Sequence, residues 1–455
     1  MAARALTLFC IPLLLASLAP AGAAEVLGRG PAIARALAQN PQIAAAHAVE
    51  AQAQARQARA RAARLPSVTM TAALGPALKA KLAPGTAVGS TESAYGDYDG
   101  SDLSLVVGGR VDVLQPLYTF GKIGERLRAT ELEIRARQAQ TDMTRAEVAV
   151  TVARLYESLL LARDAGRFLD DTERWLVRSL ESAGVEEGAA EDELRLKAAL
   201  GIVQLGRHQA AAGWAQAQAG MVAFLAYPEG TQLEPAEAAL ELLPMPSDGE
   251  RALSQLGLRE RPELRALAQG SAAFDALAAA EQADAWPDFF ALGFLSGAYT
   301  PGRDLIESRF VRDELNHFVP GILVGARWVP LGSQASERAA ETRARAAELR
   351  HAREWAALAI PAEITKAYED LRRARQDADD ADRAAVAAKQ WLVRASADFA
   401  VGLADGRGLN DAADAFGRLR LAALDARFRH NVALAELARA TGTLVGGTST
   451  FYPTH

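Results

Sequence analysis

The residues able to do chemistry are scattered along this chain of 455 residues rather than grouped. Its six histidines form no HExxH motif and no cluster at metal-ligand spacing, so the sequence predicts no metal site. The glycine-rich run at residues 85–91, GTAVGST, lacks the lysine of a phosphate-binding loop. No nucleophile elbow or dinucleotide-binding fingerprint follows a predicted strand. The sequence therefore predicts no cofactor and no enzyme.

Two features of the sequence have simple structural interpretations. Asp411 and Asp414, in the sequence NDAADA, lie where the last helix is predicted to begin, and the helix dipole favours acidic residues in a first turn. These aspartates are then an N-terminal cap. The glycine-rich runs at residues 183–190 and 401–409 interrupt helical patterns, so their glycines serve to close turns.

Composition restricts where the protein acts. Residues 1–24 combine Arg4, an apolar run and a small-residue end, which predicts a cleaved secretory signal. Its removal takes away one basic and no acidic residue, so the formal net charge changes from −6 to −7, which disfavours nucleic-acid binding. The only cysteine, Cys10, leaves with the signal. No later stretch reaches 18 apolar residues, so any membrane crossing has to use strands.

The first half alternates between two kinds of pattern. A helix is predicted at residues 30–64, followed by strands at about 67–75 and 103–114 that show period-2 alternation and are separated by a polar loop. A helical hairpin follows at about 122–227, whose first helix of about 60 residues has to pack along another rod. Residues 25–228 thus form one structural repeat, and the proline-rich residues 229–250 form a linker.

Residues 251–442 repeat this order, with strands at about 288–296 and 316–329 and a helical hairpin at about 333–442 kinked at Pro361. The correspondences lie 212 to 221 residues apart and keep their order. They are Pro41 with Pro262, Pro116-Leu117 with Pro330-Leu331, Tyr156-Glu157 with Tyr368-Glu369, and the tetrapeptide WLVR at residues 175–178 and 391–394. Duplication explains them. The tail at residues 443–455 has no periodicity and is predicted to be disordered.

The duplicated layout behind a secretory signal resembles the TolC family of outer-membrane efflux proteins. The resemblance covers nearly all of the mature chain and is most specific at residues 115–123, QPLYTFGKI, at the turn Val401-Gly402-Leu403, and at residues 431–442, NVALAELARATG. The second junction departs from the pattern, because it is two residues shorter than the first and lacks an aromatic residue after Leu331.

The resemblance implies a mixed α/β membrane protein. Three protomers would each give four strands to a twelve-stranded β-barrel in the outer membrane, continued by a periplasmic α-helical barrel. The resemblance thus implies a homotrimer. Four strands per chain also leave open edges that lipid does not tolerate, which independently supports oligomerisation. The implied function is passive export of small molecules or polypeptides, with a periplasmic adaptor protein and an inner-membrane pump as partners.

The resemblance also assigns residues. The turns at the far end from the strands would dock the adaptor, through Gly184, Val185, Val401, Gly402 and Leu403. Asp411 and Asp414 would line the periplasmic entrance, where threefold symmetry makes six carboxylates that attract cations.

Two other functions fit a secreted, alanine-rich helical chain. A periplasmic coiled-coil adaptor is the first, although adaptors carry one hairpin and no duplicated strand pairs. A structural envelope protein without transport activity is the second, and only a conductance or export assay separates it from a channel.

Overall fold

The structure is a computed structural model, and it describes residues 24–79, 103–183, 190–303, 313–330, 332, 334–401, 403 and 406–445. The predicted signal peptide, most of the first strand loop, and the docking residues Gly184, Val185 and Gly402 lie outside these residues. The chain divides into two compact units. Unit 1 contains residues 1–44, 144–260 and 361–455, and unit 2 contains residues 45–143 and 261–360.

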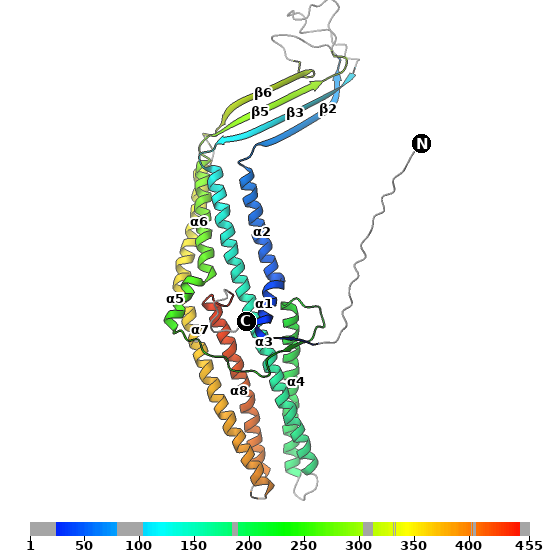
Figure 1. Cartoon of the computed structure of the whole chain (residues 1–455), viewed down its shortest axis with the longest axis vertical. Helices are drawn as coiled ribbons and strands as arrows, with labels where there is room; N and C mark the ends of the chain where they lie inside the picture. The colour runs from blue at the N-terminus through cyan, green and yellow to red at the C-terminus, as the bar shows by residue number, and fades with distance from the viewer. Residues whose placement is uncertain are drawn as a thin grey trace, which may run out of the picture. The chain divides into compact units, whose positions relative to one another are not determined.

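Unit 2 holds an antiparallel sheet of four strands in the order β2-β3-β5-β6, drawn in Figure 1. The strands are β2 (Ser67–Leu78), β3 (Leu103–Tyr118), β5 (Asp288–Tyr299) and β6 (His317–Arg327). The four predicted strands are confirmed, and three of them run longer than predicted. β3 passes through Pro116 because its partner β2 has already ended, with Ser67 opposite Leu114, so no β2 acceptor needs the missing N–H.

Two predicted helices are each broken in two. The helix expected at residues 30–64 is α1 (Arg29–Gln39) followed by α2 (Pro41–Ala62), and the second half has α5 (Glu250–Glu260) followed by α6 (Pro262–Ala283). Asn40 and Arg261, the residues before the prolines, are extended, with ψ of 128° and 125°. A proline disfavours the helical conformation of the residue before it, which ends both helices.

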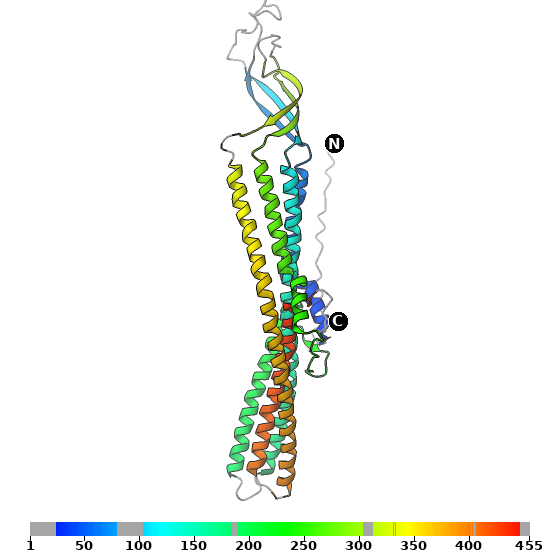
Figure 2. The same cartoon turned by 90° about the vertical axis from the view of Figure 1, so that its left-hand side faces the viewer.

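The long hairpins have the predicted lengths. They consist of α3 (Lys122–Ala183) with α4 (Ala190–Phe224), and of α7 (Ala335–Ala400) with α8 (Gly406–Ala440). Figures 1 and 2 both show these four helices side by side in unit 1. Glycine allows close packing within the first pair, since a Cβ at Gly220 would lie 2.7 Å from Leu155 Cδ2. α7 continues through Pro361 as one helix, and the predicted kink stays a prediction.

The two segments predicted to be irregular contain order. The linker holds β4 (Leu233–Pro235), which pairs in parallel with β1 (Glu25–Leu27). The tail begins with buried side chains, because Thr443 and Leu444 are 1% and 2% exposed. Thr443 Oγ1 donates to Ala438 O at 3.3 Å. The prediction of a tail disordered from Thr443 is therefore wrong at its start, since these residues complete the end of α8.

Candidate functional site

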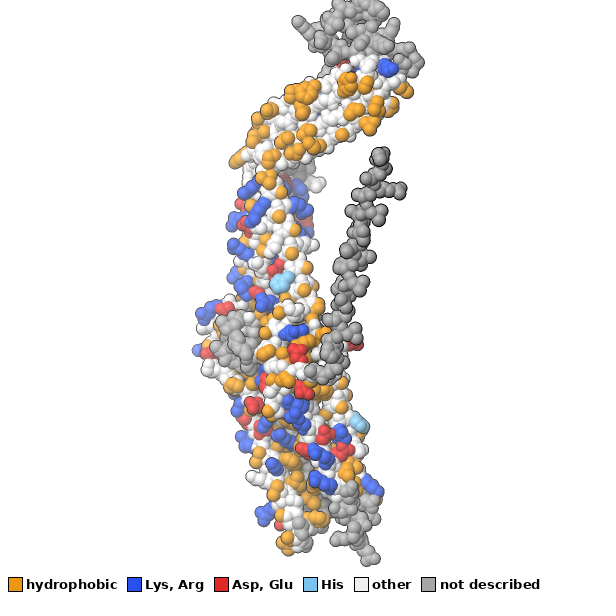
Figure 3. Space-filling model, turned by 45° about the vertical axis from the view of Figure 1, so that its right-hand side comes forward, with side chains coloured by type: hydrophobic (Ala, Val, Ile, Leu, Met, Phe, Trp, Pro, Cys, Tyr) orange, Lys and Arg blue, Asp and Glu red, His pale blue; other side chains and the backbone are white. Residues whose placement is uncertain are grey.

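One face of the sheet is apolar from end to end. The register places Val68 opposite Val113, Val111 opposite Leu295, and Leu295 opposite Pro320 on this face. Its side chains are unusually exposed, with Met70 at 75% and Ile322 at 88%. Figure 3 shows apolar side chains gathered over the strands, whereas charged side chains cover the helices. Other large exposed members of this face include Val68, Leu74, Leu78, Leu103, Leu105, Val107, Val113, Phe289, Leu295, Tyr299, Phe318 and Val324.

The opposite face is polar and partly aromatic. Arg110 Nε lies 2.7 Å from Asp112 Oδ2, and Ser296 Oγ lies 3.0 Å from His317 Nε2. The Phe294 ring covers Gly321 so closely that a Cβ there would collide with it. Because strands alternate their side chains, this division follows directly from the period-2 pattern that predicted it. A sheet with one long exposed apolar face and one polar face suits a boundary between an apolar medium and water.

The junction between β3 and α3 is held by aromatic side chains. Phe120 has φ of +50° and is followed by Gly121 at +88°, which turns the chain sharply. The Phe120 ring stacks on Trp286 with centroids 5.5 Å apart and meets Tyr118 edge-on at 4.7 Å. Lys122 Nζ donates to Trp286 O at 2.8 Å. The motif QPLYTFGKI therefore fixes the exit of the chain from the sheet into the long helix.

At the other end of the long helices, the predicted docking residues Val401 and Leu403 are exposed at 69% and 80%. The turn is shorter than predicted, because α8 begins at Gly406 rather than Asn410. Asp411 therefore lies in the second turn of α8, and the first turn holds no acidic residue. The dipole effect falls off within one turn, so the interpretation of these aspartates as a cap is wrong.

Both aspartates are exposed on α8. Asp414 Oδ2 lies 2.7 Å from Arg418 Nη2 on the next turn. Asp411 and Asp414 follow the turn at Val401 and Leu403 in sequence, and they lie about 7.5 Å and about 12 Å along α8 from Gly406. Whether they surround an opening depends on other copies of the chain, so their role stays a prediction.

A buried polar network in unit 1 escaped prediction. Arg29 Nε donates to Glu157 Oε1 at 2.5 Å, and Asn431 Nδ2 donates to Glu157 Oε2 at 2.9 Å. The Tyr156 hydroxyl donates to Glu237, and burial together with this bond raises the pKa of Tyr156 well above its ordinary value. Glu157 and Asn431 are 0% exposed. The sequence does hold one sign of this network: Glu157 and Asn431 are polar residues at helix positions where the periodicity predicts apolar core residues.

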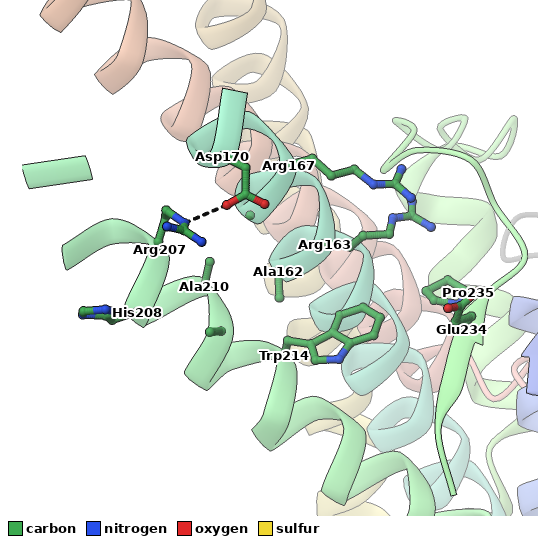
Figure 4. A pocket seen from close by; sticks show the side chains of 12 residues that line it. Ala162, Arg163, Arg167, Asp170, Arg207, His208, Ala210, Trp214, Glu234 and Pro235 are labelled. Carbon is green, nitrogen blue, oxygen red and sulfur yellow. Dashed lines mark ion pairs between the residues drawn. The ribbon is translucent and has the colours of Figure 1, made fainter. Parts of the chain in front are cut away.

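A groove of about 570 Å³ lies between α3 and α4 beside β4, shown in Figure 4. Arg163 and Arg167 of α3 and Trp214 of α4 line it. Arg207 pairs with Asp170 at 2.7 Å and also with Glu173, and Arg163 pairs with Asp164 at 3.1 Å. These cations are largely neutralised by the protein itself, and the groove holds no arrangement of nucleophile and base.

Across the residues that the structure describes, no group of three or more His, Cys, Asp or Glu side chains could hold a metal ion. None of the helices in that part of the chain is long and apolar enough to cross a membrane.

Comparisons with known proteins agree with the fold. The channel OprN is 21% identical, with 91% of this chain and 90% of that chain covered and a TM-score of 0.68. The open state of the MtrE outer-membrane channel of Neisseria gonorrhoeae is 17% identical, with 93% and 91% covered and a TM-score of 0.74. CusC is 16% identical, with 94% and 95% covered and a TM-score of 0.71. A search of curated proteins finds no match.

The family model described as outer membrane efflux protein matches residues 32–191. This stretch includes both strands of the first repeat, the junction motif and the whole of α3. The match disfavours the periplasmic adaptor, as does the presence of two long hairpins in one chain. The resemblance inferred from the sequence is thereby confirmed: residues 32–191 match the outer membrane efflux protein family, whose members are channels and not enzymes, and the chain shares the fold of outer-membrane channels of known structure.

Proposed function

We propose that this protein is the passive exit channel of a tripartite efflux pump or a type I secretion system. It acts as a homotrimer in the outer membrane and extends into the periplasm. There it receives small molecules or polypeptides from a periplasmic adaptor protein and an inner-membrane pump. The chain has no energy source of its own in this proposal, because the pump supplies it.

The observation that carries the proposal is the sheet. Its apolar face is long and exposed, and in the described part of the chain β2 and β6 each have one edge without a neighbouring strand. Backbone groups at such edges have to be paired inside lipid, and about eight strands is the smallest closed barrel. Three copies supply twelve strands, so β6 of one protomer would pair with β2 of the next around the barrel.

In this trimer, the turns between the long helices would dock the adaptor, and the aspartates near them would line the periplasmic entrance. Val401 and Leu403 are large apolar side chains exposed to water, which supports a role in adaptor docking together with Gly184, Val185 and Gly402. Asp411 and Asp414 would line the periplasmic entrance near this end. A ring of carboxylates concentrates cations at a pore mouth.

Reconstitution tests the proposal against a structural envelope protein. The mature chain is purified in detergent, its mass is determined by light scattering, and it is added to planar lipid bilayers. A trimer that gives discrete conductance steps is the expected result. A monomer soluble without detergent, or a trimer that never conducts, contradicts the proposal.

A further inference from the structure

The linker between the two repeats runs across three helices and is fastened to each. Gln218 of α4 bonds both backbone groups of Leu233, accepting from its N–H at 3.1 Å and donating to its carbonyl at 2.6 Å. On α3, Arg163 Nη1 donates to Glu237 O at 2.7 Å. Figure 1 shows this segment crossing α4, α3 and α8 within unit 1. We call residues 233–243 the strap.

The strap is fastened most firmly between α3 and α8. Asp164 of α3 accepts from Leu240 N at 2.7 Å, and Arg427 of α8 donates to Leu240 O at 3.3 Å. Asn431 of α8 accepts from Leu243 N at 3.1 Å and donates to Glu241 O at 2.8 Å.

Two further contacts reinforce these fastenings. His430 Nε2 lies 2.9 Å from Leu243 O, and Arg427 also pairs with Asp382 of α7 at 2.9 Å. The side chains of Leu233, Leu240 and Leu243 are buried at 1%, 0% and 8% exposure. One short segment of chain therefore joins the α3–α4 hairpin to the α7–α8 hairpin.

On α3 and on α8, the contacts with the strap are confined to one stretch of each helix. On α3 they involve residues 156, 163, 164 and 167, and on α8 residues 427 to 431. Residues 168–183 of α3 and 406–426 of α8 therefore continue from them to the turns. Over that length Phe168 of α3 and Phe416 of α8 meet edge-on, with ring centroids 5.6 Å apart. An aromatic contact of this kind is weakly directional compared with the hydrogen bonds at the strap.

We propose that the strap holds the two hairpins together at its own position along the helices. Opening of the channel is then confined to the helical segments between the strap and the turns. Asp164, Arg427 and Asn431 are then positioning residues for opening, although none of them needs to touch the exported molecule. The inference rests on the proposed channel function. If the strap only covers the helices as packing, cutting it leaves opening unchanged.

The proposed restraint is tested by cutting the strap after the trimer has assembled, so that folding and assembly take place with the strap intact. A specific protease site is inserted between Ala238 and Ala239, both exposed, and the assembled trimer is cleaved in detergent. The matched control places the same site between Ser247 and Asp248, also exposed, beyond the last fastening. Both cuts break the same linker, but only the first separates the bonds that Gln218 of α4 and Arg163 of α3 make with the strap from the bonds that α8 makes with it. Leu240, which Asp164 and Arg427 share, lies beyond the first cut.

The readouts are open probability in bilayers and hydrogen exchange of residues 407–426 on α8, before and after cleavage. We expect the first cut to raise the open probability at least threefold and to accelerate exchange, while the control cut changes neither. Equal effects at the two sites, or no effect at the first, overturn the inference. If uncut trimers do not conduct, the channel proposal fails, whereas unchanged exchange in a conducting trimer refutes the strap alone.

A point variant gives an independent check. Arg427→Ala removes the bonds to Leu240 and Asp382, and we expect it to raise the open probability in the same direction. Arg154→Ala is its control, because Arg154 pairs with Glu436 of α8 from α3 without touching the strap. A larger effect from Arg154→Ala than from Arg427→Ala contradicts the assignment.

Discussion

Replacing Glu157 by alanine should destabilise the protein far more than the same change at its duplicated counterpart, Glu369. Glu157 is 0% exposed and pairs with Arg29, which is 8% exposed. Removing one partner of a buried ion pair costs about 3–5 kcal/mol, because the other charge is left buried. Arg29 retains a second carboxylate, Glu237, at 3.4 Å, which places the expected cost near the low end, about 3 kcal/mol.

Glu369 provides the control from inside the same chain. Its side chain is 46% exposed and pairs with Arg372 one turn further along α7. Exposed pairs of this spacing contribute about 0.3–0.5 kcal/mol, so Glu369→Ala should be close to neutral. Both substitutions are Glu to Ala in a long helix after a tyrosine, so helix propensity changes equally in the two variants.

The assay is thermal loss of the helical circular dichroism signal at one fixed protein concentration, since an oligomer's midpoint depends on concentration. For a cooperative unit of 150–250 residues, about 3 kcal/mol lowers the midpoint by roughly 6–12 °C. The pair Arg29→Met with Glu157→Leu should be more stable than Glu157→Ala, because no buried charge remains. A shift for Glu157→Ala no larger than that for Glu369→Ala would refute the reasoning.

Four further predictions concern the surfaces and the pH response. Met70→Lys should abolish trimer insertion into lipid vesicles while its neighbour Thr69→Lys, on the other face of β2, is tolerated; equal insertion of the two contradicts the face assignment. Asp411→Ala with Asp414→Ala should weaken cation selectivity, and an unchanged reversal potential in a salt gradient argues against an entrance role. Leu403→Asp should reduce adaptor binding in a pull-down without altering the trimer, whereas intact binding removes this turn from the docking surface. Burial lowers the pKa of His430, which lies beside Arg375 and Asp379. Its contribution to stability is therefore complete above about pH 6.5 and declines as the pH falls towards the pKa of the folded state. His430→Gln should reduce the dependence of the melting temperature on pH between about pH 7 and pH 5.

The strands and long hairpins could be predicted because their signals are local. Alternation in β3 and β6 assigns each side chain to a face, and that assignment survives in the register of the folded sheet. The signals for the helix breaks, Pro41 and Pro262, are equally local, and the same two prolines mark the duplication. Both prolines start a helix, and the residue before each is extended. The same breaks are close to where the chain passes from unit 1 to unit 2.

The start of α8 and the course of the strap could not be predicted from local sequence signals. Gly406 and Gly408 disfavour a helix by propensity, so a helix beginning at Asn410 was the local expectation, and tertiary context overrides it. The strap has no periodicity at all. Its order comes from side chains more than 70 residues away, such as Asp164 and Asn431, which bond backbone groups of Leu240 and Leu243. Pairings of this range leave no pattern in the linker's own sequence.

The strap also explains why two copies of one dipeptide have different surroundings. Tyr156 donates to Glu237 of the strap, and the two partners of the buried Glu157, Arg29 and Asn431, also bond the strap. A chain with two repeats has only one linker between them, so only one copy of the dipeptide can bind it. Tyr368-Glu369 lacks that partner, and Glu369 instead forms an exposed pair with Arg372. Duplication thus copies helices and strands, while the single linker determines which copy keeps a buried charge.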